Sequence, residues 1–113
     1  MTDIFVFGSN LAGRHGKGAA LFALNQRGAI YGMGYGLQGR SFAIPTKDER
    51  LRTLSLSRIR HYVLLFIEFA KSHPHLTFEL TPIGCGLAGY QPRDIGPMFA
   101  DAPPNVKKPK EFL

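Results

Sequence analysis

The sequence predicts an α/β layer fold built around a mostly parallel sheet. Three apolar runs of strand length alternate with two segments of helical character, an order typical of such folds. Glycine-rich loops follow the first and the third run, and 13 of the 113 residues are glycine, against an average near 7%. Because parallel strands end at one edge of a sheet, we expect both loops at the edge where α/β sheets bind ligands.

The first third of the chain has the pattern of a strand, a glycine loop and a helix. Residues 3–8 (DIFVFG) are almost all apolar, as in a strand buried on both faces. After the loop SNLAGRHGKG, the segment GAALFALNQRG is rich in Ala and Leu, which favour helix. Gly28 stands where a glycine commonly ends a helix. Residues 29–39, with four glycines, are expected to form a loop or a short irregular strand.

The rest of the chain predicts two more strands around an amphipathic helix. Residues 41–46 (SFAIPT) read as a buried strand ending at Pro45, and residues 76–83 (LTFELTPI) as the third strand. Between them, from Ser57 to Ser72, the apolar side chains on one helical face are Ile59, Tyr62, Val63, Phe66 and Ala70. Residues 93–99 suit one or two helical turns. We expect a domain over residues 1–101 and an extended, basic C-terminal tail over 102–113.

Composition narrows the function classes. No window of 18 apolar residues exists and no signal-peptide pattern opens the chain, so neither a membrane partner nor export is expected. The single cysteine, Cys85, excludes an internal disulfide and a Cys-rich zinc site, and the expected location is the cytoplasm. The net charge of +6 indicates an anionic partner such as a nucleotide, a phosphate or a nucleic acid. No cofactor or metal is expected.

The two glycine loops are the candidate ligand site. Bare glycine backbone and a helix N-terminus can hold phosphate groups, and two such loops at one edge could clamp a diphosphate. Cys85 reads as a packing residue, since no base is paired with it. Lys47 closes the second strand, where it could contact phosphate or attack a sugar carbon, or simply be solvated beside two acidic neighbours. The candidate ligand-binding residues are Ser9, Asn10, Gly13, Gly16, Lys17, Gly18, Gly84, Cys85, Gly86, Leu87, Ala88 and Gly89.

Three motifs together resemble a known superfamily. In order they are FGSN…GRHGKGAA, FAIPTK and IGCGLAGY, and they span residues 3–90. This set resembles the macrodomain superfamily, in particular the branch of terminal ADP-ribose protein glycohydrolase and of the macrodomain antitoxins paired with DNA ADP-ribosylating toxins. The resemblance implies a compact, truncated, three-layer α/β/α sandwich. It also implies an ADP-ribosyl glycohydrolase acting on ADP-ribosylated nucleic acid or protein.

The resemblance also implies residue roles. Asn10 matches the asparagine that orients the distal ribose, and Gly16 and Gly18 match the first phosphate loop. Residues 84–87 match the second phosphate loop, and Lys47 matches the catalytic lysine of this branch. The chain departs from the glycohydrolase at Ala88, which stands where that enzyme has its catalytic aspartate. The antitoxins of the same branch also lack a carboxylate at this position.

Two alternatives to the enzyme stay open. One is a module that binds or sequesters ADP-ribose or a related nucleotide without turnover. The other is a protein that reuses this fold and its positive charge to bind nucleic acid. The usual strand before residue 3 and the C-terminal strand and helix of a macrodomain are not recognisable in the sequence. The edge strand exposed in this way could favour self-association.

Overall fold

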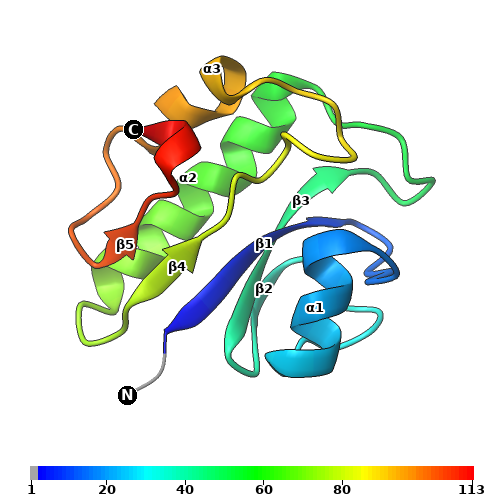
Figure 1. The fold of residues 1–113 in the computed structure, drawn as a ribbon, viewed down its shortest axis with the longest axis horizontal. Helices are drawn as coiled ribbons and strands as arrows, with labels where there is room; N and C mark the ends of the chain where they lie inside the picture. Colours follow the sequence, from blue (N-terminus) through cyan, green and yellow to red (C-terminus); the bar gives the residue numbers. More distant parts are fainter. Residues whose placement is uncertain (1–2) are drawn as a thin grey trace.

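Five strands form one mixed sheet in the computed structural model, which describes residues 3–113. In sheet order these are β2 (Gly36–Gln38), β3 (Ser41–Lys47), β1 (Ile4–Asn10), β4 (Phe78–Leu80) and β5 (Val106–Lys107). β1 pairs in parallel with β3 and with β4, and β4 pairs in parallel with β5, whereas β2 runs antiparallel to β3. The prediction of a mostly parallel sheet with the first strand between the second and third is confirmed (Figure 1).

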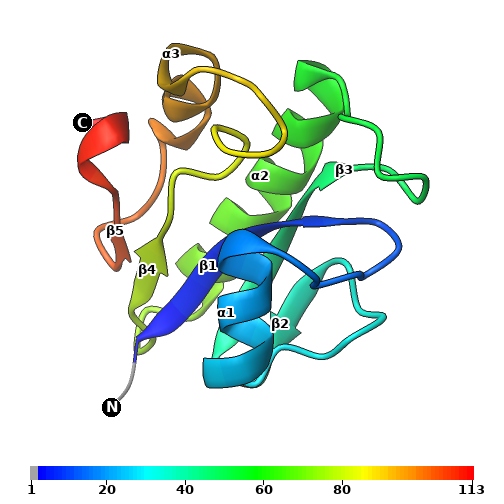
Figure 2. The ribbon, with the colours of Figure 1, turned by 45° about the vertical axis from the view of Figure 1, so that its right-hand side comes forward.

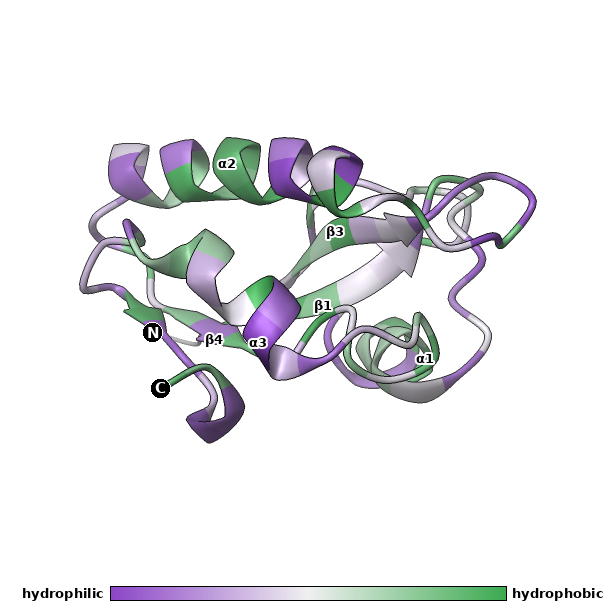
Figure 3. Cartoon of the chain, turned by 90° about the horizontal axis from the view of Figure 1, so that it is seen from above, coloured by the Kyte–Doolittle hydropathy of each residue, from purple (hydrophilic) through white to green (hydrophobic). Residues whose placement is uncertain are grey.

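Helices lie on both faces of this sheet. They are α1 (Gly18–Gln26), α2 (Leu56–Ser72) and the short α3 (Pro92–Ile95), which continues into a 3-10 helix over Gly96–Phe99. Figure 3 shows α2 along one side of the strands and α1 on the other. Within residues 3–113, no helix combines the length and the apolar character needed to cross a membrane.

The two faces of β1 belong to different cores. Ile4 and Val6 point into the larger core under α2, and Phe5 and Phe7 point into the smaller core under α1. In the larger core the ring of Phe66, fully buried on α2, lies 5.1–6.3 Å from three other phenylalanine rings, those of Phe42, Phe78 and Phe99. On the other face, α1 presents alanines to the sheet, so the helix can approach closely. Burial on both faces explains the unbroken apolar run at residues 4–7.

The strands differ from the sequence prediction at their ends. β3 continues through Pro45 to Lys47. Proline is accepted there because the β1–β3 register shifts next to it, between Ser9 and Asn10, and an irregular ladder needs no regular N–H donor. β4 is shorter than predicted and stops before Thr81, whose hydroxyl donates to Val6 O (2.7 Å).

The last twelve residues pack on the domain, where the sequence suggested an extended tail. Val106 is buried and pairs with Phe78 of β4. The side-chain amide of Asn105 donates to three carbonyl oxygens at 3.0–3.1 Å, those of Ala70, His73 and Leu76, which lie at the end of α2 and in the turn after it. In Figure 2 the C-terminal segment lies against the end of the sheet formed by β4 and β5. Long-range hydrogen bonds of this kind leave no local pattern in the sequence.

The aromatic cluster should dominate the stability of the domain. We expect Phe66→Ala to lower the free energy of unfolding by about 3–5 kcal/mol, because it leaves a cavity among buried rings. Leu65→Ala, on the same helix but at a position 40% exposed, should cost less than about 1.5 kcal/mol. Urea denaturation of both variants measures the difference. Equal losses would show that the ring cluster is not the centre of the core.

Candidate functional site

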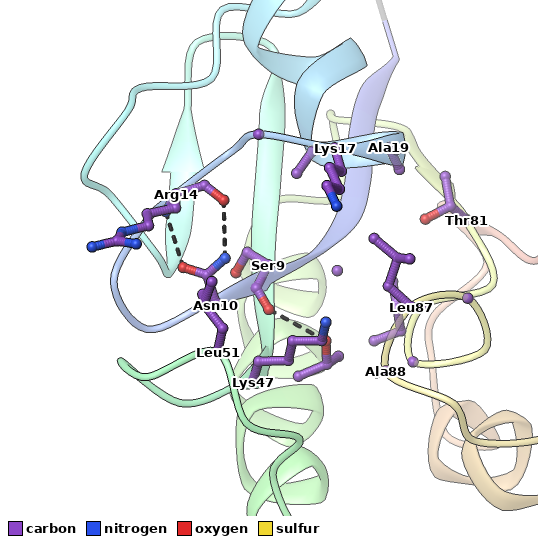
Figure 4. Close-up of a pocket in the computed structure, with 18 of the residues that line it drawn as sticks. Ser9, Asn10, Arg14, Lys17, Ala19, Lys47, Leu51, Thr81, Leu87 and Ala88 are labelled. Carbon is purple, nitrogen blue, oxygen red and sulfur yellow. Dashed lines mark hydrogen bonds between the residues drawn. The ribbon is translucent and has the colours of Figure 1, made fainter.

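A cavity of about 660 Å³ opens at the carboxyl ends of the parallel strands, between the two glycine loops. Both loops turn toward this end of the sheet (Figure 2). The predicted site residues that line the cavity are Ser9, Asn10, Gly16, Lys17, Gly18, Lys47, Gly84, Cys85, Gly86, Leu87 and Ala88. Gly13 and Gly89 do not line it. Residues far apart in the chain therefore meet in one pocket (Figure 4).

The first loop is held by its own side chains and main chain. The Asn10 amide donates to Arg14 O (2.9 Å), and its oxygen accepts from Arg14 N (2.9 Å). The Ser9 hydroxyl donates to the carbonyl oxygen of Gly34. The resemblance assigned Asn10 to a ligand ribose. In this structure its amide also holds the loop backbone, and Asn10 still lines the cavity.

Glycines allow the segment before β2 to pack directly on the first loop. A Cβ on Gly13, whose φ is +72°, would lie 2.2 Å from the carbonyl carbon of Gly32. A Cβ on Gly34 would lie 2.3 Å from Asn10 O. Neither position leaves room for any side chain, and Gly13 has in addition a φ that L-residues rarely adopt. Gly13 is thus a packing glycine of the loop and not part of the cavity wall.

A buried pair of polar side chains joins the same two segments, and sequence reasoning did not find it. The fully buried His15 ring places Nε2 3.1 Å from Met33 O and 3.2 Å from Gln38 Oε1. Gln38 Nε2 also donates to Met33 O (3.0 Å), and its oxygen accepts from Ile30 N (2.8 Å). One signal was present in the sequence: a histidine and a glutamine stand in segments otherwise rich in glycine and apolar residues.

Lys47 lies at the floor of the pocket, at the end of β3 (Figure 4). It bridges to Thr53 across a short antiparallel turn. The Asp48 carboxylate accepts from Arg50 N and Arg52 N (both 2.9 Å) and lies 3.5 Å from the Arg52 guanidinium. The hydrogen bond from the Arg52 main chain, with that from Arg50 and the charge of Arg52, holds the pKa of Asp48 below its ordinary value. None of the ion pairs found within residues 3–113 involves Lys47.

The turn after Lys47 places a strained leucine on the pocket rim. Leu51 has φ +63° and is 42% exposed, and it is the one residue other than glycine with a left-handed backbone in the described chain. A leucine in this conformation costs on the order of 1 kcal/mol. Leu87, 69% exposed in the second loop, also lines the cavity. The rim near Lys47 is therefore apolar, although no sequence pattern indicates a role for Leu51.

The second loop is braced from outside the cavity. Thr53 Oγ1 donates to Ala88 O (3.1 Å), and Tyr90 N donates to Gly84 O (2.8 Å). The Tyr90 hydroxyl donates to Leu54 O (2.7 Å). These bonds join the loop to the segment after β3, so that Lys47 and residues 84–88 form one connected wall.

Cys85 has the character of a packing residue at this wall. It is half-buried, and burial, followed by the charges of Asp94 and Glu111, raises the pKa of its thiol. A thiol with a raised pKa stays protonated at neutral pH and is a poor nucleophile. This agrees with the sequence interpretation of Cys85. Within residues 3–113, no three His, Cys, Asp or Glu side chains gather as a metal site would require.

The charged side chains that line the cavity are all cationic: Arg14, Lys17 and Lys47. No Asp or Glu of the described chain lines it. Three features together favour an anion in this cavity: the main-chain N–H groups of the glycine loops, the N-terminus of α1 at Gly18 and the three cationic side chains. Comparison with models of protein families, with curated proteins and with solved structures finds no match for this chain.

Adding a methyl group should lower the stability of the protein at Gly13 of the first loop but leave it nearly unchanged at Gly16. Gly13→Ala should lower the free energy of unfolding by more than about 2 kcal/mol, because the added carbon meets the Gly32 backbone at a positive φ. Gly16→Ala should change stability by less than about 1 kcal/mol, because no atom lies within 4 Å of the place its new Cβ would take. Thermal and urea unfolding would measure both. A Gly13→Ala protein as stable as Gly16→Ala would contradict the close packing of the two segments.

Proposed function

We propose that this protein binds ADP-ribose, free or as the ADP-ribose unit of a modified nucleic acid or protein. The observation that carries the proposal is the charge and backbone of the pocket: three cations and two glycine loops at one sheet edge, with no carboxylate on the described wall. A diphosphate between the loops would receive main-chain N–H groups from both sides. The volume of about 660 Å³ falls in the range of small-molecule sites.

The proposal extends to a macrodomain-like ADP-ribosyl glycohydrolase in which Lys47 is the catalytic residue. After the Lys47 ammonium gives up a proton to water, its nitrogen would displace the acceptor at C1 of the distal ribose, and the acceptor would leave with a second proton from that nitrogen. The glycosylamine would open to an imine as the ring oxygen takes up a proton. Water would then hydrolyse the imine, releasing ADP-ribose and the amine. The position of Lys47 on the pocket floor, outside any ion pair in the described chain, supports this role.

A non-catalytic binding module is the second candidate, and one observation favours it. Ala88 stands where the glycohydrolase that this chain resembles has an aspartate. The described pocket wall holds no carboxylate that could activate water in its place. In this case Lys47 would only contact phosphate. Turnover of an ADP-ribosylated substrate distinguishes the two candidates.

Gly86→Val tests the binding site. A Cβ at Gly86 meets nothing within 4 Å, and the residue is not in the left-handed region, so the fold should persist while the side chain fills the space above the loop. We expect ADP-ribose binding to fall by more than about 100-fold in calorimetry, with an unchanged melting curve. Leu64→Val, at a position 44% exposed on α2, is the control. A folded Gly86→Val that binds like the wild type would place the ligand elsewhere.

Lys47→Ala tests the chemistry. Removing a group that acts in the transition state should abolish hydrolysis of ADP-ribosylated DNA or protein. ADP-ribose affinity should stay within about tenfold, or roughly 1.4 kcal/mol. Borohydride should trap a covalent adduct with the wild type only. Lys71→Ala, on α2 away from the pocket, serves as the control. If the wild type binds ADP-ribose tightly but hydrolyses neither substrate, the enzyme is excluded and the non-catalytic binding module is the function that remains.

A further inference from the structure

His15 lies in the first glycine loop between two residues that line the pocket, but its own ring is turned into the protein. Arg14 and Gly16 line the cavity, and His15 does not. The His15 ring is fully buried, and its centre lies 5.3 Å from that of the Phe7 ring and 6.4 Å from that of the Tyr31 ring. Neither the binding nor the chemistry proposed above uses this imidazole.

The neighbours of His15 determine which of its nitrogens carries the hydrogen. Nε2 lies 3.1 Å from Met33 O and 3.2 Å from Gln38 Oε1. The orientation of the Gln38 amide is fixed, because its oxygen accepts from Ile30 N (2.8 Å) and its nitrogen donates to Met33 O (3.0 Å). Both neighbours of Nε2 are therefore acceptors, so Nε2 carries the hydrogen and donates. Nδ1 is then an acceptor, and it has no partner within residues 3–113.

Stability alone does not account for a histidine at this position. A buried acceptor without a partner destabilises a fold. If His15 were absent, Met33 O would still accept from Gln38 Nε2, and Gln38 Oε1 would still accept from Ile30 N. A leucine of similar size would thus leave neither oxygen unpaired, and it would remove the unpartnered Nδ1. Departures of this kind from the most stable choice are concentrated at functional sites.

The bond from Nε2 fixes the loop immediately before its free N–H groups. The Asn10 amide holds the main chain of Arg14, and His15 ties the next residue to the segment before β2. The main-chain N–H groups of residues 16–18 donate to no acceptor in the described part of the chain. Packing does not hold these residues either, since a Cβ on either glycine of this range would meet no atom within 4 Å. The directional bonds just before them therefore decide where the three N–H groups point.

We infer that His15 is a positioning residue of the pocket, which through its Nε2–H presets the main chain of residues 16–18 for a diphosphate. The identity of that diphosphate, as part of ADP-ribose, rests on the proposed function. A preset loop loses less conformational freedom when the ligand binds. His15 thus raises the affinity for the ligand without contacting it.

Two substitutions of His15 in the full chain test the inference. His15→Gln keeps an N–H donor and His15→Leu has none, while His75→Leu, at an exposed position in the turn after α2, is the control. We expect calorimetry to give His15→Leu an ADP-ribose affinity more than about tenfold below that of the wild type, and His15→Gln an affinity within about threefold of it. The urea midpoint of His15→Leu should equal or exceed that of the wild type, because the unpartnered acceptor is gone.

A measurement without ligand accompanies these. The NMR order parameters of the main-chain N–H groups of residues 16–18 should fall in His15→Leu, toward those of a flexible loop, and should stay at the wild-type values in His15→Gln. His75→Leu should change neither affinity nor order parameters.

The possible failures lead to different conclusions. His15→Leu binding within about threefold of the wild type would overturn the inference, and so would His15→Gln binding as weakly as His15→Leu, because the donor would then not be what the loop needs. A His15→Leu protein that unfolds well below the wild-type urea midpoint would show that His15 serves the stability of the fold instead. If the wild type binds no ADP-ribose, the proposed function is wrong, and the order parameters without ligand still decide whether His15 positions the loop.

Discussion

The arrangement of this molecule depends on one constraint: β1 is buried on both faces and bonded in parallel on both edges. Ile4 and Val6 enter one core while Phe5 and Phe7 enter the other. A slip of the strand by one residue would therefore move each side chain into the opposite core, where the space is shaped for different residues. Parallel neighbours on both edges then bring the ends of β1, β3 and β4 together. The loops that follow these strands meet for this reason, and the pocket follows from the topology.

The walls of the pocket are rigid because its small polar side chains bond to main-chain atoms. The Asn10 amide fixes the first loop, the buried His15 and Gln38 join it to the segment before β2, and Thr53 holds the second loop at Ala88. A site made in this way presents preformed backbone donors and loses little entropy when an anion binds.

The features that the sequence predicts are those with a local cause. The helical period of α2 and the apolar run of β1 reflect burial, and burial determines the residue type at each position independently of distant partners. The glycine loops can be placed because the strand order determines where they lie. The features that sequence reasoning misses depend on distant partners: Asn105 stabilises the end of α2 from 35 residues away, and Gln38 accepts from His15 across 23 residues. In the sequence, Pro45 looks like the end of a strand. The strand continues past it because the pairing with β1 is irregular at this point, and that irregularity cannot be seen in the local sequence.

The turn that follows Lys47 contains Leu51, whose left-handed backbone is strained. The turn from Asp48 to Arg52 is closed by main-chain bonds at 2.8 and 3.0 Å and by the Asp48 carboxylate, and the left-handed leucine completes it. A glycine or asparagine would adopt this φ at lower cost, yet neither would present an apolar side chain at the pocket rim. Leu51 and Leu87 thus bring apolar side chains to the wall that Lys47 also lines, and at Leu51 this comes with a strained backbone.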